Sequence, residues 1–307
     1  MIPILNHIIS FANVANIDSY LKKWKKGGFA VAKKTVRHAP GLRNGFVYFG
    51  PEYIEFCWVE DEKLFRKGAK NYRKFIRRHP SPYGVAFESK DVAALHSRLR
   101  KGGYKVPAVY SKGPRDADKS VVWWTFQSIP LRYLPGAWTF ALTYEFRRNQ
   151  KGPRRMVIGK NTLYAISGLT FVTKFPQKRV LAWKKFLASN SNAVKVNRGR
   201  YRLKLGPHQL EWLTPSTYKE EYGIPYTTPQ KYKSLREIAL IHLLAADLKR
   251  AGAVLRRNKF KLRPDDRRLF VGPQKHDGFA FVVTEKQIQT WRKERARFGQ
   301  KFIVKYT

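Results

Sequence analysis

The stretch HIISFANVANIDSYLKKWKKGGF, residues 7–29, decides the fold, because it recurs as YGVAFESKDVAALHSRLRKGGY at residues 83–104. Each copy runs from a strand rich in β-branched and aromatic residues through a polar turn into an amphipathic helix that ends in two glycines. Asp18 and Asp91 lie near the helix starts, where a carboxylate can cap free N–H groups. A repeat of this length indicates a fold built from copies of one supersecondary unit.

The strand–helix order recurs twice in the second half of the chain. The two later copies are LYAISGLTFVTKFPQKRVLAWKKFLA, from residue 163, and REIALIHLLAADLKRAGAVL, from residue 236. Short alternating runs such as NGFVYFG and EYIEFCWVED follow the helices, and their alternation predicts strands. We therefore predict an α+β fold of four βαβββ units, paired into two domains whose curved mixed sheets each enclose a cleft.

The repeat also suggests where the domains divide. Residues 148–160 carry many charges together with Gly and Pro, which is typical of a linker. The segment from Trp291 to the C-terminus is either a final helix and strand or an added basic contact segment. We predict an N-terminal domain at 1–147, with units at 1–75 and 80–147, and a C-terminal domain at 161–307.

The cysteine content and the hydropathy of the sequence indicate the cellular compartment. The single cysteine, Cys57, excludes an intrachain disulfide and a cysteine-rich metal cage built from this chain alone. The apolar N-terminal run has no leading Lys or Arg and no small-residue cleavage site. No segment reaches about 18 uninterrupted apolar residues, the length that a membrane helix needs. We expect a soluble cytoplasmic protein without a membrane partner.

The charge of the chain is strongly basic. Lys and Arg number 62 against 21 Asp and Glu, which gives a formal net charge of +41. The excess is spread along the chain, whereas a reader of base sequence presents one defined element to a groove. Two interpretations stay open: a basic solvated surface, or non-specific contact with nucleic acid or another polyanion.

The segments LNHIISFANV, RHAPGLRNGFVYFGPEYIEFCWVED, YGVAFESKDVAALHSRLRKGG and WWTFQSIPLRYLPGAWTFALTYEF follow one another in this order. In that order they resemble the glyoxalase-like domain family, a branch of the vicinal oxygen chelate superfamily that includes glyoxalase I, extradiol dioxygenases and bleomycin-resistance proteins. The resemblance implies a small-molecule cleft in the N-terminal domain. In metal-using members, His and Glu side chains on the first and last strands of each paired unit hold a divalent metal.

Transferred to this sequence, that pattern gives His7, Glu55 and Glu145 as predicted ligands of one divalent metal such as Zn, Ni, Fe or Mn, and the last ligand position could equally align with Ala141. Tyr83 or Pro82 stands where a second His is expected. A catalytic metal of this type takes about three protein ligands and keeps one position open, and imidazole supplies much of the affinity. Because the set is incomplete, a bound metal and the absence of any cofactor are equally open.

Alternation also indicates which side chains face the cleft. It places Tyr53, Glu55 and Cys57 on one face of their strand, and it sends Trp124 away from Trp123. A buried carboxylate without a metal or a cation can act as a general base. The predicted catalytic residues are Glu55, Glu145 and His38; the predicted substrate-binding residues are Arg37, Arg43, Asn44, Tyr83 and Trp124.

Each of these assignments has a structural alternative. Glu55 can be one half of an ion pair with a Lys or Arg, and the loop at His38 can be a turn in which Pro40 and Gly41 serve only conformation. In the second half, Glu211 has the place of Glu55, but the strand AISGLTFV offers no His. We therefore predict that the C-terminal domain is a degenerate partner.

Three functions follow from these observations. The first is a glyoxalase-like enzyme, of the lyase, isomerase or dioxygenase type, acting on a small oxygen-rich or aromatic molecule in the N-terminal cleft. The second is a non-catalytic small-molecule binding or resistance protein. The third is a basic nucleic-acid-associated or ribosome-associated protein that uses the same scaffold.

Overall fold

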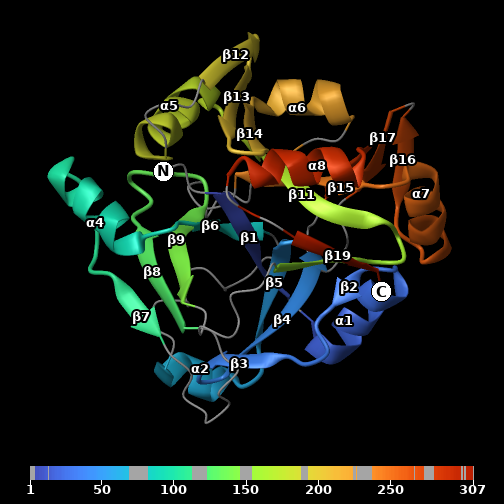
Figure 1. Ribbon diagram of the computed structural model, residues 1–307, viewed down its shortest axis with the longest axis horizontal. Coiled ribbons are helices and arrows are strands. Elements are labelled where there is room, and N and C mark those ends of the chain that lie inside the picture. The colour runs from blue at the N-terminus through green and yellow to red at the C-terminus, as the bar shows by residue number, and fades with distance from the viewer. Residues whose placement is uncertain are drawn as a thin grey trace.

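The computed structural model in Figure 1 describes most of the chain. The side chains of some residues inside the described ranges, among them His38 and Glu145, lie outside the description. The described ranges are 4–12, 14–68, 82–112, 123–145, 154–187, 193–223, 226, 237–265, 267–272, 280–298, 300 and 302–306.

The N-terminal half consists of two βαβββ units that share one nine-stranded sheet. The first unit contains β1 (Ile4–Phe11), α1 (Ile17–Lys26), β2 (Ala30–Val31), β3 (Val36–Ala39), β4 (Leu42–Phe49) and β5 (Glu52–Val59). The second contains β6 (Pro82–Glu88), α4 (Val92–Lys101), β7 (Tyr110–Lys112), β8 (Trp123–Ile129) and β9 (Trp138–Glu145). The strand order is β2-β4-β5-β1-β6-β9-β8-β7, with β3 beside β4, so the two units meet where β1 and β6 pair antiparallel.

The C-terminal half repeats this topology in an eight-stranded sheet, ordered β12-β13-β14-β11-β15-β18-β17-β16. Its first unit contains β11 (Leu163–Val172), α5 (Pro176–Leu187), β12 (Ala193–Asn197), β13 (Arg200–Leu205) and β14 (His208–Leu213). Its second contains β15 (Ile238–Ala245), α7 (Leu248–Arg257), β16 (Leu262–Asp265), β17 (Arg268–Val271) and β18 (Phe281–Glu285). The predicted α+β fold of four βαβββ units is confirmed.

Elements outside the repeat join the two halves. The predicted linker contains β10 (Arg154–Ile158), which pairs in parallel with β19 (Phe302–Tyr306) at the end of the chain. The C-terminal segment thus forms α8 (Ile288–Ala296) and β19. Two further helices, α2 (Glu62–Gly68) and α6 (Pro215–Tyr222), follow the last strand of the first and third units. The precise domain limits stay a prediction.

Capping residues explain where the repeat helices begin and end. The Asp91 side chain accepts a hydrogen bond from the Ala94 amide at 2.8 Å and caps α4. In α1 the cap is Asn16, and Asp18 lies in the first turn, where it faces the positive end of the helix dipole. After each helix the second glycine, Gly28 or Gly103, adopts a positive φ near 80°, a conformation that glycine adopts without strain.

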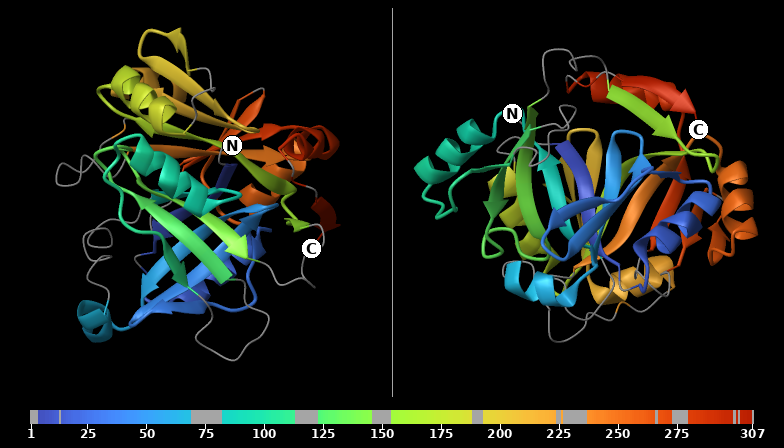
Figure 2. Two further views of the ribbon diagram at one scale, coloured as in Figure 1. Left: turned by 60° about the vertical axis from the view of Figure 1, so that its left-hand side comes forward. Right: turned by 90° about the horizontal axis from the view of Figure 1, so that it is seen from below.

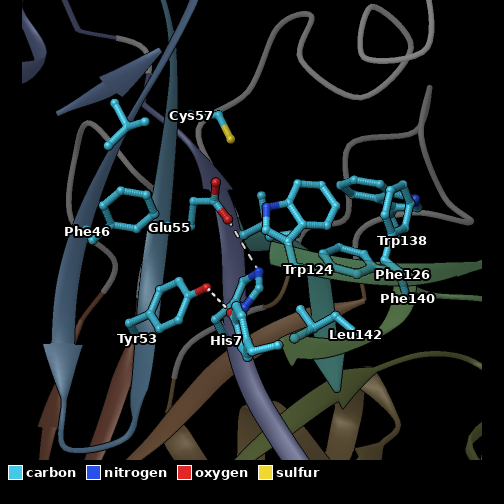
Figure 3. A pocket seen from close by; sticks show the side chains of 13 residues that line it. His7, Phe46, Tyr53, Glu55, Cys57, Trp124, Phe126, Trp138, Phe140 and Leu142 are labelled. Carbon is cyan, nitrogen blue, oxygen red and sulfur yellow. Dashed lines mark hydrogen bonds and ion pairs between the residues drawn. The ribbon is translucent and has the colours of Figure 1, made fainter. Parts of the chain in front are cut away.

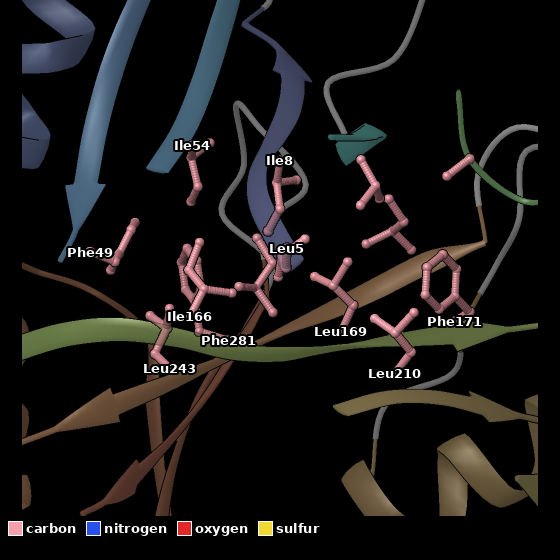
Figure 4. Packing of buried hydrophobic residues seen from close by; sticks show 14 of the residues in the cluster. Leu5, Ile8, Phe49, Ile54, Ile166, Leu169, Phe171, Leu210, Leu243 and Phe281 are labelled. Atoms are coloured by element: carbon pink, nitrogen blue, oxygen red, sulfur yellow. The ribbon is translucent and has the colours of Figure 1, made fainter. Parts of the chain in front are cut away.

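The two sheets pack against each other through one continuous apolar core (Figures 2 and 4). Leu5 and Ile8 of β1 point toward Ile166 and Leu169 of β11, which lie on the facing sheet. The helices close the sides of this core, where Trp24 of α1, for example, lies among residues of both sheets. The opposite face of each sheet, which we call the outer face, carries a separate apolar cluster. The pocket lies on the outer face of the N-terminal sheet.

A buried charged group crosses the same interface. Glu52 of β5 lies 2.5 Å from Arg295 of α8 and 3.2 Å from His208 of β14. The other oxygen of Glu52 accepts a hydrogen bond from the Ile166 amide of β11. All three side chains are almost wholly buried, so the halves share polar as well as apolar contacts. Among the described residues, no helix is long and apolar enough to cross a membrane.

Candidate functional site

A pocket of about 210 Å³ opens on the outer face of the N-terminal sheet (Figure 3). The two units contribute differently, because His7 and Glu55 come from β1 and β5, whereas β8 and β9 contribute mostly aromatic side chains. Its lining residues are His7, Ile9, Val36, Phe46, Tyr53, Glu55, Cys57, Trp124, Phe126, Trp138, Phe140, Leu142 and Tyr144. As alternation predicted, Tyr53, Glu55 and Cys57 share one face, and Trp124 lines the pocket.

The polar wall centres on Glu55. The His7 Nε2 atom lies 3.3 Å from Glu55 Oε2, and the Asn44 side-chain amide donates a hydrogen bond to Glu55 Oε1. The side chain of Glu55 is 13% exposed and that of His7 is 4% exposed, so one edge of the carboxylate is reachable from the pocket. The structure therefore brings together a carboxylate, an imidazole and an amide, all from the first unit.

The orientation of His7 is set from behind by Asn6. The Asn6 Nδ2 donates to Glu88 Oε2 at 3.1 Å, which turns its carbonyl oxygen toward His7 Nδ1, 2.7 Å away. The same oxygen accepts a hydrogen bond from the Tyr144 hydroxyl at 3.2 Å. Because Asn6 Oδ1 can only accept, His7 Nδ1 carries its hydrogen, and Nε2 is the nitrogen that faces Glu55.

Aromatic rings contact the imidazole and form much of the rest of the pocket. Tyr53 stacks on His7 with ring centroids 4.4 Å apart, and Phe140 meets the same ring edge-on at 5.7 Å. Burial raises the pKa of Tyr53 well above its ordinary value, and the neighbouring Tyr144 and Glu55 raise it further. Burial, with Glu55, also raises the pKa of the Cys57 thiol. Both groups are therefore neutral at physiological pH.

The remaining predicted site residues lie in different places. Arg37 and Arg43 both pair with Glu60, and neither belongs to the described lining of the pocket. Tyr83 is buried behind the pocket, where its ring stacks on Trp138 and its side chain hydrogen-bonds Cys57. The side chains of His38, on β3, and Glu145, the last residue of β9, lie outside the described part of the structure, so their roles stay predictions.

The described donor set is small for a catalytic metal. Within the described residues, no three His, Cys, Asp or Glu side chains gather where they can hold a metal ion. His7 and Glu55 supply two donors, whereas a catalytic site of the zinc type has about three protein ligands. A metal that also uses Glu145 stays a prediction, and we assign no chemical step to a metal.

Sequence reasoning missed several residues of this site. Asn6, Tyr53 and Tyr144 were not among the predicted site residues, although Asn6 and Tyr53 contact His7 and Tyr53 and Tyr144 line the pocket. The signal for Asn6 was its place beside His7 on a strand, which is an unusual position for an amide within an apolar run. Tyr144 follows from alternation along β9, since Trp138, Phe140 and Leu142 line the same pocket.

Known structures share this architecture at low sequence identity. A hypothetical protein from Staphylococcus aureus has a TM-score of 0.60 and 12% identity, covering 93% of this chain and 100% of its own. The Mn(II)-bound glyoxalase from Novosphingobium aromaticivorans has a TM-score of 0.54 and 12% identity, covering 100% and 88%. The 2,2',3-trihydroxybiphenyl 1,2-dioxygenase from Sphingomonas wittichii strain RW1 has a TM-score of 0.54 and 10% identity, covering 100% and 96%.

A comparison of the sequence with curated proteins finds no match. The sequence does match the family model described as a glyoxalase-like domain, over residues 5–187. That region includes every residue of the pocket and extends to the end of α5 in the second half. The predicted resemblance is confirmed, and this chain belongs to the family of proteins with a glyoxalase-like domain.

Proposed function

We propose that the N-terminal pocket binds a small planar aromatic molecule carrying a hydroxyl or carbonyl group, and that Glu55 and His7 receive this polar group. One observation carries the proposal: a single pocket combines an aromatic wall with one hydrogen-bonding edge. Trp124, Phe126 and Phe140 face that edge from the other side of the pocket (Figure 3). Such sites hold a ligand by apolar contact and orient it by a few polar groups.

The size of the pocket supports a ligand with one ring. An apolar cavity of about 150 Å³ is large enough to hold benzene, and this pocket measures about 210 Å³. The difference leaves room for one or two small substituents. Because Tyr53 and Cys57 are neutral at physiological pH, Glu55 is the negative charge at the wall, and a ligand hydroxyl that donates to it is favoured.

The same geometry suggests the chemistry. A carboxylate that accepts a hydrogen bond from a ligand hydroxyl is placed to accept its proton as a general base. We propose this role for Glu55, with His7 beside it as the second group of the pair. The enzyme alternatives are a lyase or isomerase and a dioxygenase. The non-catalytic alternative is a binding or resistance protein that uses the same contacts without turnover.

Binding of catechol, followed by tryptophan fluorescence, tests the proposal. We expect saturable binding that weakens at least 10-fold in Glu55→Gln, since one charge-assisted hydrogen bond is worth about 1.5–3 kcal/mol. Toluene, which has the ring without the hydroxyls, should bind wild type and variant alike. Equal catechol affinity in wild type and Glu55→Gln, or no saturable binding, would show that the polar edge does not receive the ligand.

Glu60→Gln is the matched control, because Glu60 follows the same strand but pairs with Arg37 and Arg43 away from the pocket. Its affinity for catechol should equal that of wild type. Oxygen uptake with catechol, with and without added Fe(II), separates the dioxygenase alternative from binding alone. The nucleic-acid alternative rests on the charge of +41 and stays a prediction.

A further inference from the structure

The C-terminal sheet carries a polar cluster at the place that corresponds to the N-terminal pocket. Thr170 of β11 pairs with Glu211 of β14, just as Ile9 of β1 pairs with Glu55 of β5 in the first half. Both halves thus place a carboxylate at the same point of the fold. Paired residues lie on one face of a sheet, so Glu211 lies on the outer face, as Glu55 does.

The imidazole of this half comes from a different strand. His7 pairs with Ala86, and the equivalent pair is Gly168 and His242. A Cβ added at Gly168 would lie 2.1 Å from the carbonyl oxygen of Gln209, so no side chain fits at the position of His7. His242 supplies an imidazole from β15, at the position that Ala86 has in the first half.

Hydrogen bonds connect the cluster. Glu211, whose side chain is only 1% exposed, accepts from Arg200 Nε at 2.7 Å and from Arg202 Nε at 2.8 Å. The Thr170 hydroxyl lies 2.6 Å from His242 Nε2 and 3.4 Å from Glu211 Oε2. Burial lowers the pKa of His242, and the nearby arginines lower it further against the opposing effect of Glu211. The imidazole is therefore neutral, and the arginines carry the positive charge of this face.

Two aromatic wall positions of the N-terminal pocket are arginines in the C-terminal half. Arg202 pairs with Glu211 as Phe46 pairs with Glu55. Arg268 corresponds to Phe126 by the pairing of the strands. In the C-terminal half, His242 pairs with Val282, and Thr284 on the same strand pairs with Arg268. In the N-terminal half, Ala86 pairs with Phe140, and Leu142 on the same strand pairs with Phe126. The C-terminal half thus keeps the carboxylate but has two arginines where the N-terminal pocket has Phe46 and Phe126. This exchange favours an anionic ligand.

The local charge leaves a positive excess. Glu221 of α6 accepts from Arg200 and Arg268, so in the ion pairs of the described side chains three guanidinium groups share two carboxylates. Arg202 uses only its Nε for Glu211, and its side chain is 36% exposed. Among the described residues, the two terminal nitrogens of Arg202 have no acceptor. A guanidinium presents these two nitrogens as a fork that matches a carboxylate or phosphate.

We propose that the exposed edge of this cluster, on the outer face of the C-terminal sheet, is a second binding site, for a small oxyanion, with the terminal nitrogens of Arg202 as its main contact. The cluster is separate from the aromatic pocket, and its charged groups Arg202, Glu211 and Arg268 lie outside the region 5–187 that the family model covers. Carboxylate and phosphate groups share the chemistry that this site recognises. A ligand that carries either group meets the exposed end of Arg202, beside the buried cluster of Glu211, Thr170 and His242.

Calorimetric titration with inorganic phosphate, and separately with oxalate, tests this site at an ionic strength held constant with NaCl. Wild type should bind at least one of the two anions saturably, and the tighter binder identifies the preferred oxyanion. We expect Arg202→Gln to weaken that binding at least 10-fold. Arg202→Lys, which keeps the charge but loses the fork, should weaken it several-fold, and thermal unfolding of each variant checks that it is folded.

Arg98→Gln is the matched control, because Arg98 is an exposed arginine on α4 and its loss changes the net charge equally. Its anion affinity should equal that of wild type. Equal weakening in Arg98→Gln and Arg202→Gln would assign the effect to the general positive field and overturn the proposal, as would the lack of saturable binding in wild type. Glu55→Gln should leave anion binding unchanged, so this result does not depend on the function of the aromatic pocket.

Discussion

At the scale of single residues, Glu52 is a buried carboxylate that links the two halves of the molecule. It is wholly buried between the two halves, and its partners Arg295 and His208 are buried with it. Breaking a buried ion pair by removing one charge leaves the other without compensation. The triad therefore couples the stability of the N-terminal sheet to that of the C-terminal one.

Glu52→Gln should lower the free energy of unfolding by about 3–5 kcal/mol, because Arg295 would keep its charge without a carboxylate partner. Urea denaturation followed by circular dichroism measures this. The control is Glu62→Gln, which removes an exposed ion pair with Arg66 on α2 and should cost less than about 1 kcal/mol. Similar losses in the two variants would contradict the role given to the triad.

His208 makes stability depend on pH. Burial lowers its pKa below the value of about 6.5 that the unfolded chain has, so the unfolded state binds the proton more readily. The stabilisation from a neutral His208 is complete above pH 6.5 and is lost as the pH falls, by at most about 1.4 kcal/mol per pH unit. Denaturation at pH 7.5 and 5.5 should show a smaller drop in His208→Gln than in wild type.

The comparison with wild type matters because other groups also titrate. Burial lowers the pKa of His242 and raises the pKa of Glu237, and these two groups act on stability in opposite directions. Both remain in His208→Gln, so the difference between the two proteins isolates His208. An equal loss of stability in both proteins would show that His208 is not the sensitive group.

At the scale of elements, the double glycines that revealed the repeat differ in their surroundings. Gly28 and Gly103 have the same left-handed conformation. A Cβ at Gly28 would lie 2.8 Å from the backbone nitrogen of Asn161 in the second half, whereas at Gly103 it would meet nothing within 4 Å. One motif thus ends a helix in both places, but only at Gly28 does it also form a contact between the halves.

Gly103→Ala should cost roughly 1–2 kcal/mol, the strain of a left-handed residue with a side chain. Gly28→Ala should cost at least about 1 kcal/mol more, because steric crowding against Asn161 adds to that strain. Thermal or urea denaturation of the two variants provides the measurement. Equal costs would mean that the contact at Asn161 can relax without loss.

Element order and strand faces were predictable because they depend on local patterns. The repeat of strand, helix and glycines fixed the topology, and alternation placed Glu55 and Trp124 on the pocket face. The C-terminal cluster was not predictable in this way. Its members come from β11, β13, β14, β15 and β17, and no short motif joins them. Only the register between strands, with its bulges in β11 and β15, brings Thr170 and His242 together.

At the scale of the whole molecule, part of the dispersed positive charge lies on two helices beside the interface between the halves. The C-terminal ends of α1 and α7 meet there, where Trp24 and Phe260 pack with ring centroids 6.3 Å apart. None of the exposed cations around this junction has an ion pair among the described residues. They are Lys22, Lys23, Lys25, Lys26, Arg256, Arg257, Lys259 and Lys261.

We expect duplex DNA of mixed sequence to bind this junction through its phosphates, because the exposed large apolar side chains of the described residues lie on other elements. Affinity should fall steeply with salt, with a slope of about 0.9 in log–log form for each phosphate contacted. Replacing Lys23, Lys25, Lys26 and Arg257 by Gln should reduce that slope. An equal change of charge elsewhere, at Lys63, Lys195, Lys219 and Lys293, should reduce it less. If both sets weaken binding alike in a fluorescence anisotropy titration from 50 to 200 mM salt, the excess charge acts only as a diffuse field and the junction has no special part in it.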